Sequence, residues 1–97
     1  MVLRNEKWDK RFLRMAREIA SWSKDPSAKI GAVAVKDRRI LSTGYNGFPA
    51  GIDDDPIRYE DRETKYQFVV HAEMNAIYNA GRNGIPLQDS TMYVYGL

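Results

Sequence analysis

The sequence of 97 residues predicts an α/β domain with a mixed β-sheet flanked by helices, in the order helix, strand, strand, loop, helix, strand. Three observations predict this class. Apolar residues recur at spacings of three and four across residues 6–23, which indicates an amphipathic helix. Two strand-like segments around a polar turn follow at residues 29–45. A second helical segment at 72–80 then leads into a third strand-like segment at 91–95.

Composition and charge limit the class of protein. Two Trp, three Phe and six Tyr, with many aliphatic residues, supply enough apolar mass for one core. The formal charge is +2 with acidic and basic residues interspersed, which argues against a dedicated nucleic-acid-binding protein. The chain has no cysteine, no apolar run long enough to span a membrane, and no apolar signal core near its start. We therefore expect a cytoplasmic domain without disulfides.

The first helix, over residues 6–23, carries one apolar stripe. Asn5 fits its N-cap, because a short polar side chain can accept hydrogen bonds from the first free N–H groups. The pair Asp25-Pro26 is expected to stop it, because the residue before proline is disfavoured in helical geometry. The side chains expected to face the core are Trp8, Phe12, Met15, Ala16, Ile19 and Trp22.

A β-hairpin and a long loop follow. Residues 29–36 read as a buried strand, and 40–45 as the strand that returns. Two glycines and a proline make 46–51 a shaped loop, and 52–67 continue as a polar, charged loop. The three consecutive aspartates at 53–55 read as a solvated acidic run rather than a metal cluster, because neighbouring side chains do not face one point.

The second helix is expected over residues 72–80, with Gly81 as its C-cap. The strand at 91–95 comes next and leaves an unpaired sheet edge. We therefore expect residues 1–97 to form an incomplete single domain, the front portion of a longer one.

The only histidine, His71, lies two residues before Glu73. Zinc nucleobase deaminases use this spacing, with the histidine as a zinc ligand and the glutamate as a proton shuttle. Residues i and i+2 do not share a helix face, but the two side chains can still converge if the metal lies beyond the helix N-terminus. The spacing by itself also fits a core or capping histidine beside a glutamate that interacts with the helix dipole.

Five segments around this pair resemble the deoxycytidylate (dCMP) deaminase family. In chain order they are residues 25–32 (DPSAKIGA), 44–51 (GYNGFPAG), 64–66 (TKY), 71–77 (HAEMNAI) and 90–94 (STMYV). The resemblance covers nearly the whole chain in the right order and is far more specific than the His-x-Glu spacing. The family's Pro-Cys-x-x-Cys would begin directly after Leu97, and these residues do not contain it.

The resemblance implies the cytidine deaminase fold and the hydrolysis of dCMP to dUMP and ammonia, which supplies thymidylate synthesis. It implies Zn²⁺ held by His71 and by two cysteines downstream of Leu97, with Glu73 as the catalytic proton shuttle. It places Asn46, Gly47 and Ala72 in the substrate-binding site.

The resemblance also implies partners. Lys65, Tyr66 and Arg82 are candidates to contact the phosphates of the substrate or of an effector. The substrate is dCMP, the effectors are dCTP and dTTP, and the assembly is a homo-oligomer, commonly a hexamer. Neither nucleic acid nor a membrane is expected as a partner.

Other interpretations stay open for several residues. Asn46 could hold a left-handed turn beside Gly47, Lys65 and Arg82 could be solvated cations, and Tyr66 could be half-buried. Two alternative functions compete with dCMP deamination. One is another zinc deaminase that shares His-Ala-Glu (acting on tRNA adenosine, guanine or a riboflavin precursor), against which residues 44–47 and 64–66 argue. The other is a non-catalytic nucleotide-binding fragment that lacks the cysteine ligands.

Overall fold

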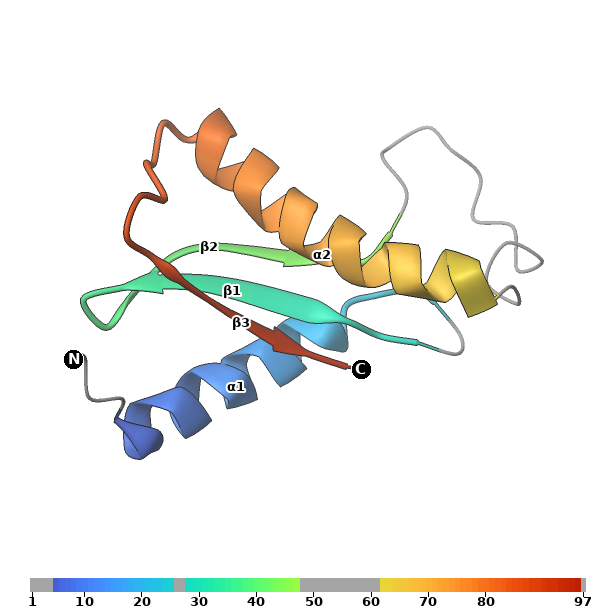
Figure 1. Cartoon of the computed structure of the whole chain (residues 1–97), viewed down its shortest axis with the longest axis horizontal. Coiled ribbons are helices and arrows are strands. Elements are labelled where there is room, and N and C mark those ends of the chain that lie inside the picture. Colours follow the sequence, from blue (N-terminus) through green and yellow to red (C-terminus); the bar gives the residue numbers. More distant parts are fainter. Residues whose placement is uncertain (1–4, 26–27, 48–61, 97) are drawn as a thin grey trace.

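The computed structural model describes residues 5–25, 28–47 and 62–96 of the chain, with side chains described only from residue 70 onward in the last range. The elements follow the predicted order (Figure 1). They are α1 (Glu6–Ala20), β1 (Gly31–Lys36), β2 (Arg39–Tyr45), α2 (Arg62–Arg82) and β3 (Thr91–Tyr95).

The three strands form one sheet in the order β2-β1-β3, and the two helices lie on its opposite faces (Figure 1). Both described strand pairings are antiparallel, so the predicted mixed sheet is represented here by its antiparallel part. Alternate residues of β1 and β3 serve the two faces. Val33, Val35 and Tyr93 pack with α1, whereas Ala32 and Val94 pack with α2. The α/β class predicted from the sequence is confirmed.

Helix α1 begins as predicted and ends earlier. The Asn5 side chain accepts hydrogen bonds from the backbone N–H groups of Lys7 and Trp8, at 3.1 and 3.4 Å, which confirms the N-cap. The helix ends at Ala20 instead of residue 23, and the Ser21 hydroxyl already binds the Glu18 carbonyl there. Asp25-Pro26 therefore does not stop it.

Two members of the predicted apolar stripe are not core residues. Met15 is 41% exposed and Trp22 is 54% exposed. Fewer residues of α1 are buried against the sheet than predicted, because small side chains on the buried face bring the helix close to the sheet. Trp22 lies beyond the helix, with its ring edge-on to that of Tyr45 at 6.2 Å between centroids. The buried residues of α1 are Phe12, Ala16, Ile19 and Ala20.

The hairpin between β1 and β2 is tighter than predicted. Lys36 pairs directly with Arg39, which leaves Asp37 and Arg38 as a two-residue turn. Both turn residues have positive φ, of 52° and 61°, as a type I′ turn requires. A β-bulge between Ala34 and Val35 then shifts the register, so the pairing continues at 34↔42 after 35↔40.

Helix α2 starts ten residues earlier than predicted, at Arg62 instead of residue 72. The polar, charged stretch before His71 contains no glycine or proline from Arg62 onward, and glutamate, lysine, arginine and glutamine all favour helix. The density of charge in this stretch therefore does not indicate a loop. None of the described helices is long and apolar enough to cross a membrane.

The C-cap of α2 is Gly84 and not Gly81. Gly84 has a φ of +67°, and its N–H donates to the Gly81 carbonyl at 3.1 Å. The Ile85 N–H donates to the Ala80 carbonyl at 2.9 Å. These two bonds define a Schellman motif, in which glycine supplies the left-handed residue without steric cost.

Gly44 lets β2 approach the backbone of α2 closely. A Cβ atom at this position would lie 2.3 Å from the Ala76 nitrogen and 2.4 Å from the Ala72 oxygen. Because these are backbone atoms of a helix, they cannot move aside as a flexible side chain would. The close approach brings the segment that contains His71 directly onto β2.

We expect Gly44→Ala to lower the free energy of unfolding by about 1–3 kcal/mol or more, because α2 must shift away from β2. The matched control is Gly81→Ala in the same helix, where a Cβ would meet nothing within 4 Å. There alanine is expected to stabilise by about 0.5–1 kcal/mol through helix propensity. Urea unfolding of both variants checks the prediction, and equal effects of the same sign would contradict it.

Candidate functional site

The last residues of β2 are bonded to α2 by a row of side chains. Asn79 Nδ2 donates to the Thr43 carbonyl and Asn75 Nδ2 donates to the Tyr45 carbonyl, each at 2.8 Å. The Ser42 hydroxyl donates to the Ala76 carbonyl at 2.7 Å. The helix and strand therefore run antiparallel, with one helical turn matched to two strand residues.

His71 is the next position on the same face of the helix, one turn before Asn75. It lies four residues before Asn75, which is one turn or about 6 Å along the helix. Gly47 lies two residues beyond Tyr45, which is about 6.8 Å farther along the extended chain. The same spacing therefore places His71 at the Asn46-Gly47 end of β2. Its side chain is exposed.

His71 and Glu73 flank the buried seam of α2. Ala72, between them, is fully buried and packs with Ala76, Ile30 and Ala32. A step of 100° per residue places His71 and Glu73 on either side of Ala72. Glu73 is half-buried, whereas His71 is exposed. The pair lies well inside α2, so the predicted convergence beyond the helix N-terminus is wrong for this structure.

Asn46, directly after β2, is fully buried and bonded through both ends of its amide. Its Oδ1 accepts from the Ile30 N–H at 2.8 Å, and its Nδ2 donates to the Ala28 carbonyl at 2.9 Å. Nδ2 also lies 3.4 Å from Asp25 Oδ2. The Ser23 hydroxyl donates to the Asn46 carbonyl at 2.9 Å and accepts from the Asp25 N–H.

This network ties the segment between α1 and β1 to the start of the 46–51 loop. Ser23 and Asp25 are 3% and 1% exposed, and every buried side-chain polar atom among the described residues has a partner. Asn46 is not among the described residues with positive φ, so the alternative of a left-handed turn is wrong. The sequence predicts Asp25 as a helix stop and as part of the 25–32 segment, and nothing in it points to Ser23, because the signal is a contact with a residue about twenty positions away.

The other predicted site residues are placed only in part. Residues 48–61 and the side chains of Lys65 and Tyr66 lie outside the described part of the chain. Arg82 is exposed, with its guanidinium 5.9 Å from the centre of the Tyr78 ring. Eleven residues separate Arg82 from His71, which is about 16 Å along the helix. Arg82 is therefore not beside His71.

Among the described residues, the side chain that could bind zinc as the resemblance implies is the imidazole of His71. No group of three or more histidine, cysteine, aspartate or glutamate side chains that could hold a metal ion occurs among them. A catalytic zinc takes three protein ligands and a water. The imidazole fits one of these positions, and the others must come from outside the described residues.

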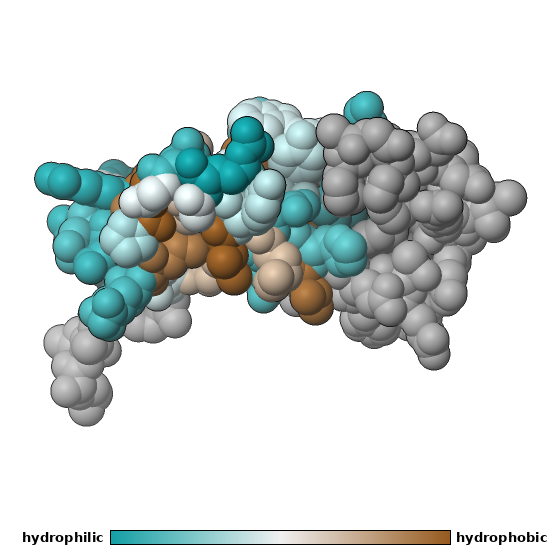
Figure 2. Space-filling model, turned by 90° about the horizontal axis from the view of Figure 1, so that it is seen from above, coloured by the Kyte–Doolittle hydropathy of each residue, from teal (hydrophilic) through white to brown (hydrophobic). Residues whose placement is uncertain are grey.

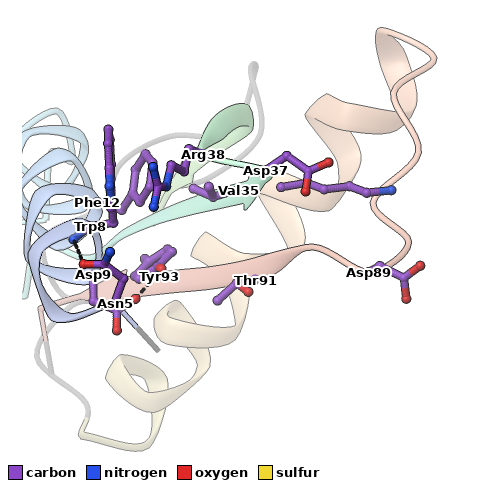
Figure 3. Close-up of a pocket in the computed structure, with 11 residues that line it drawn as sticks. Asn5, Trp8, Asp9, Phe12, Val35, Asp37, Arg38, Asp89, Thr91 and Tyr93 are labelled. Carbon is purple, nitrogen blue, oxygen red and sulfur yellow. Dashed lines mark hydrogen bonds between the residues drawn. The ribbon is translucent and has the colours of Figure 1, made fainter. Parts of the chain in front are cut away.

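A cavity of about 580 Å³ in the described structure lies elsewhere, at the hairpin end of the sheet (Figure 3). Several of the side chains that line it have partners within the chain. The Tyr93 hydroxyl donates to the Asp9 carboxylate at 2.5 Å, and the Arg38 guanidinium lies 4.8 Å from the centre of the Trp8 ring. This cavity is at the opposite end of β2 from Asn46 and takes no part in the site.

Comparisons by sequence relate this chain to known proteins. Residues 6–96 match the family described as "Cytidine and deoxycytidylate deaminase zinc-binding region". A Caenorhabditis elegans protein named as a probable deoxycytidylate deaminase is 52% identical over 88 residues, covering 87% of this chain and 44% of its own length. The mouse deoxycytidylate deaminase is 40% identical over 93 residues, covering 90% and 51%.

A solved structure shows the same fold. The dCMP deaminase of cyanophage S-TIM5, in complex with dCMP and dUMP, superposes with a TM-score of 0.74 at 23% identity, covering 95% of this chain and 67% of that one. The chain spans about half the length of the curated relatives it matches. Because the family match extends over nearly all of its residues, this chain belongs to the cytidine and deoxycytidylate deaminase family.

Proposed function

We propose that the protein carrying this chain hydrolyses dCMP to dUMP and ammonia. The observation that carries the proposal is the row along α2, which brings His71 to the Asn46-Gly47 end of β2. A histidine beside the loop that resembles a nucleotide-site wall is the arrangement that a zinc deaminase needs. The names of the relatives and the nucleotides bound by the cyanophage enzyme support dCMP as the substrate.

We assign the proton transfers to Glu73. Zinc, held in part by His71, would supply a bound water of lowered pKa at the site. The Glu73 carboxylate accepts the proton of the attacking water and gives it to N3 of the cytosine ring. The same carboxylate then takes the proton of the hydroxyl group added at C4 and passes it to the amine, so that the C4–N bond breaks, ammonia leaves and the C4 carbonyl forms.

The substrate-binding residues take different parts in this proposal. Gly47 is half-exposed, with open space where a Cβ would be, so its backbone can touch the nucleotide. Asn46 and Ala72 are fully buried and are proposed to form the base of the site. Lys65 and Tyr66 remain candidates for phosphate contacts. Arg82, about 16 Å from His71 along α2, is proposed to meet an effector triphosphate such as dCTP or dTTP and not the substrate.

Turnover of four substrates by the zinc-loaded protein tests the proposal: dCMP, deoxycytidine, guanine and a tRNA anticodon stem. We expect dCMP to be preferred, with deoxycytidine weak because it lacks the phosphate. Activity on the tRNA stem alone would overturn the assignment in favour of a tRNA deaminase. Activity on guanine alone would overturn it in favour of a purine deaminase.

We also propose that residues 1–97 are the N-terminal portion of the deaminase domain. The lengths of the relatives and the absence of cysteine support this proposal. The remaining zinc ligands would then be cysteines outside these residues. Metal analysis of the purified 97-residue chain discriminates between this proposal and a self-sufficient zinc site, for which stoichiometric zinc would be the evidence.

We further propose that copies of the protein associate into a homo-oligomer, a hexamer in the family, through the outer face of α2. Val70, Met74, Ile77 and Tyr78 are 47–65% exposed and follow one helical stripe. Apolar side chains gather on this face of the molecule (Figure 2). An exposed apolar stripe of this kind marks an interaction surface.

Met74→Glu is expected to shift the assembly to smaller species, because a carboxylate would be buried without a partner in the interface. The matched control is Leu13→Glu on α1, a position that is 40% exposed. Size-exclusion chromatography with light scattering measures both masses. A Met74→Glu protein with the wild-type mass would refute this choice of surface.

A further inference from the structure

We infer that Asn75 is a positioning residue of the site: its hydrogen bond to the Tyr45 carbonyl sets where α2 lies along β2, and thereby where His71 lies relative to Gly47. The inference rests on the proposed role of His71. It gives a function to an asparagine inside a helix, where this residue type ordinarily disfavours helix and has to find a partner.

The carbonyls that α2 binds face the free edge of β2. The Asn46 N–H donates to the Ile30 carbonyl, so the main-chain groups of Asn46 point toward β1. Main-chain groups alternate along a strand, and those of Tyr45 and Thr43 therefore point away from β1. In the described sheet β2 has a partner strand on one side only. Asn75 and Asn79 are thus the donors for two edge carbonyls.

Directional hydrogen bonds, and not the apolar contact, fix the register between α2 and β2. The helix meets the sheet through Ala72 and Ala76, and the strand meets the helix through Gly44. Such small side chains allow close approach, but they do not interlock and so do not prevent the helix from sliding along the strand. Apolar contact is also non-directional. Three side-chain-to-backbone bonds, from Ser42, Asn75 and Asn79, supply that direction.

Asn75 is the member of this set that can control His71. It lies one helical turn from His71, whereas Asn79 lies two turns away. Without the Asn75 bond, the helix is still held at Asn79 and Ser42, but the turn that carries His71 can move relative to the loop. A displacement of about 1 Å in a catalytic site can cost on the order of 100-fold in rate.

The test compares Asn75→Asp with Asn79→Asp in the zinc-loaded protein. Aspartate keeps the shape of asparagine but places an acceptor against the carbonyl, so both variants lose the same kind of bond. We expect similar losses in Tm for the two. Asn75→Asp is expected to raise the zinc concentration for half-loading and to lower kcat/KM for dCMP by roughly 10–100-fold. Asn79→Asp should leave both within about 3-fold of wild type.

Amide hydrogen exchange gives a readout that is independent of turnover. Exchange of residues 70–76 should accelerate in Asn75→Asp and not in Asn79→Asp, because only the first variant frees the turn near His71. Asn75→Gln keeps an amide donor on a longer arm and is expected to recover part of the zinc affinity. If Asn75→Asp does not fold, Asn75→Gln against Asn79→Gln decides the same question.

The outcomes separate this inference from the proposed function. Equal loss of zinc affinity in the Asn75 and Asn79 variants overturns the positioning role, even if the wild-type protein turns over dCMP. If the wild-type protein binds zinc but does not act on dCMP, the proposed substrate fails. A selective loss of zinc in the Asn75 variants would then still support the positioning role.

Discussion

Replacing Glu73 with glutamine is expected to lower kcat for dCMP by roughly 10²–10⁴-fold while the protein keeps its zinc. Glutamine has the same shape and is accommodated in the same half-buried position on α2. It cannot accept the proton of the attacking water or deliver one to the ring and the leaving amine. Because the side chain is assigned no metal contact, zinc content is expected to stay unchanged.

Single-turnover kinetics with metal analysis of the same sample measure the effect. The matched control is Glu18→Gln, an exposed glutamate on α1, which should leave kcat unchanged. A near-normal rate for Glu73→Gln would remove Glu73 from the chemistry. Loss of zinc together with loss of rate would instead make Glu73 part of the metal site.

Asn46→Ala is expected to lower the free energy of unfolding by about 3–5 kcal/mol, one of the largest losses available to a single substitution in this chain. The substitution leaves the Ile30 N–H, the Ala28 carbonyl and the Asp25 carboxylate without the amide that binds them. Asn46 has no exposed surface, so water cannot replace the lost amide as a hydrogen-bond partner.

Urea unfolding measures the loss, and Asn83→Ala is the matched control. Asn83 is exposed, and its Nδ2 makes a bond to the Asn79 carbonyl at 3.0 Å, so its replacement should cost less than about 1 kcal/mol. Similar costs at both positions would show that the network around Asn46 does not hold the loop.

Asn46→Asp tests the same network through pH. The new carboxyl would face the Asp25 carboxylate and the Ala28 carbonyl, so its pKa in the folded state would lie above its unfolded value. The destabilisation is then fully present above the folded-state pKa and shrinks as pH falls, because protonation restores a donor. Stability that is equally low at every pH would contradict this account.

Several elements could be predicted from the sequence because their causes are local. The bounds of β3 agree residue for residue, and the N-cap of α1 at Asn5 is confirmed. A strand of alternating side chains and a capping side chain each depend on neighbours within a few positions. The spacing of His71 and Glu73 also predicts their roles in zinc binding and proton transfer, which stay predictions.

Other features were predicted wrongly for a physical reason. The sequence predicts loop before residue 72, whereas α2 starts at Arg62, because helix propensity outweighs charge density there. Met15 is predicted to be a core residue but is 41% exposed, because periodicity gives the direction of a helix face and not how wide a part of that face the sheet covers. Gly81 is predicted to be the C-cap, although the left-handed residue is Gly84.

By itself, the sequence determined the α/β class, the order of the elements and the two residues on which the proposed chemistry depends. Only the tertiary structure decided that Asn46 is a buried junction and that Asn75 and Asn79 bind α2 to β2. The Asn79 bond joins residues 36 positions apart. Bonds of this kind form only after the helix has packed on the strand, so no local pattern of residues reports them.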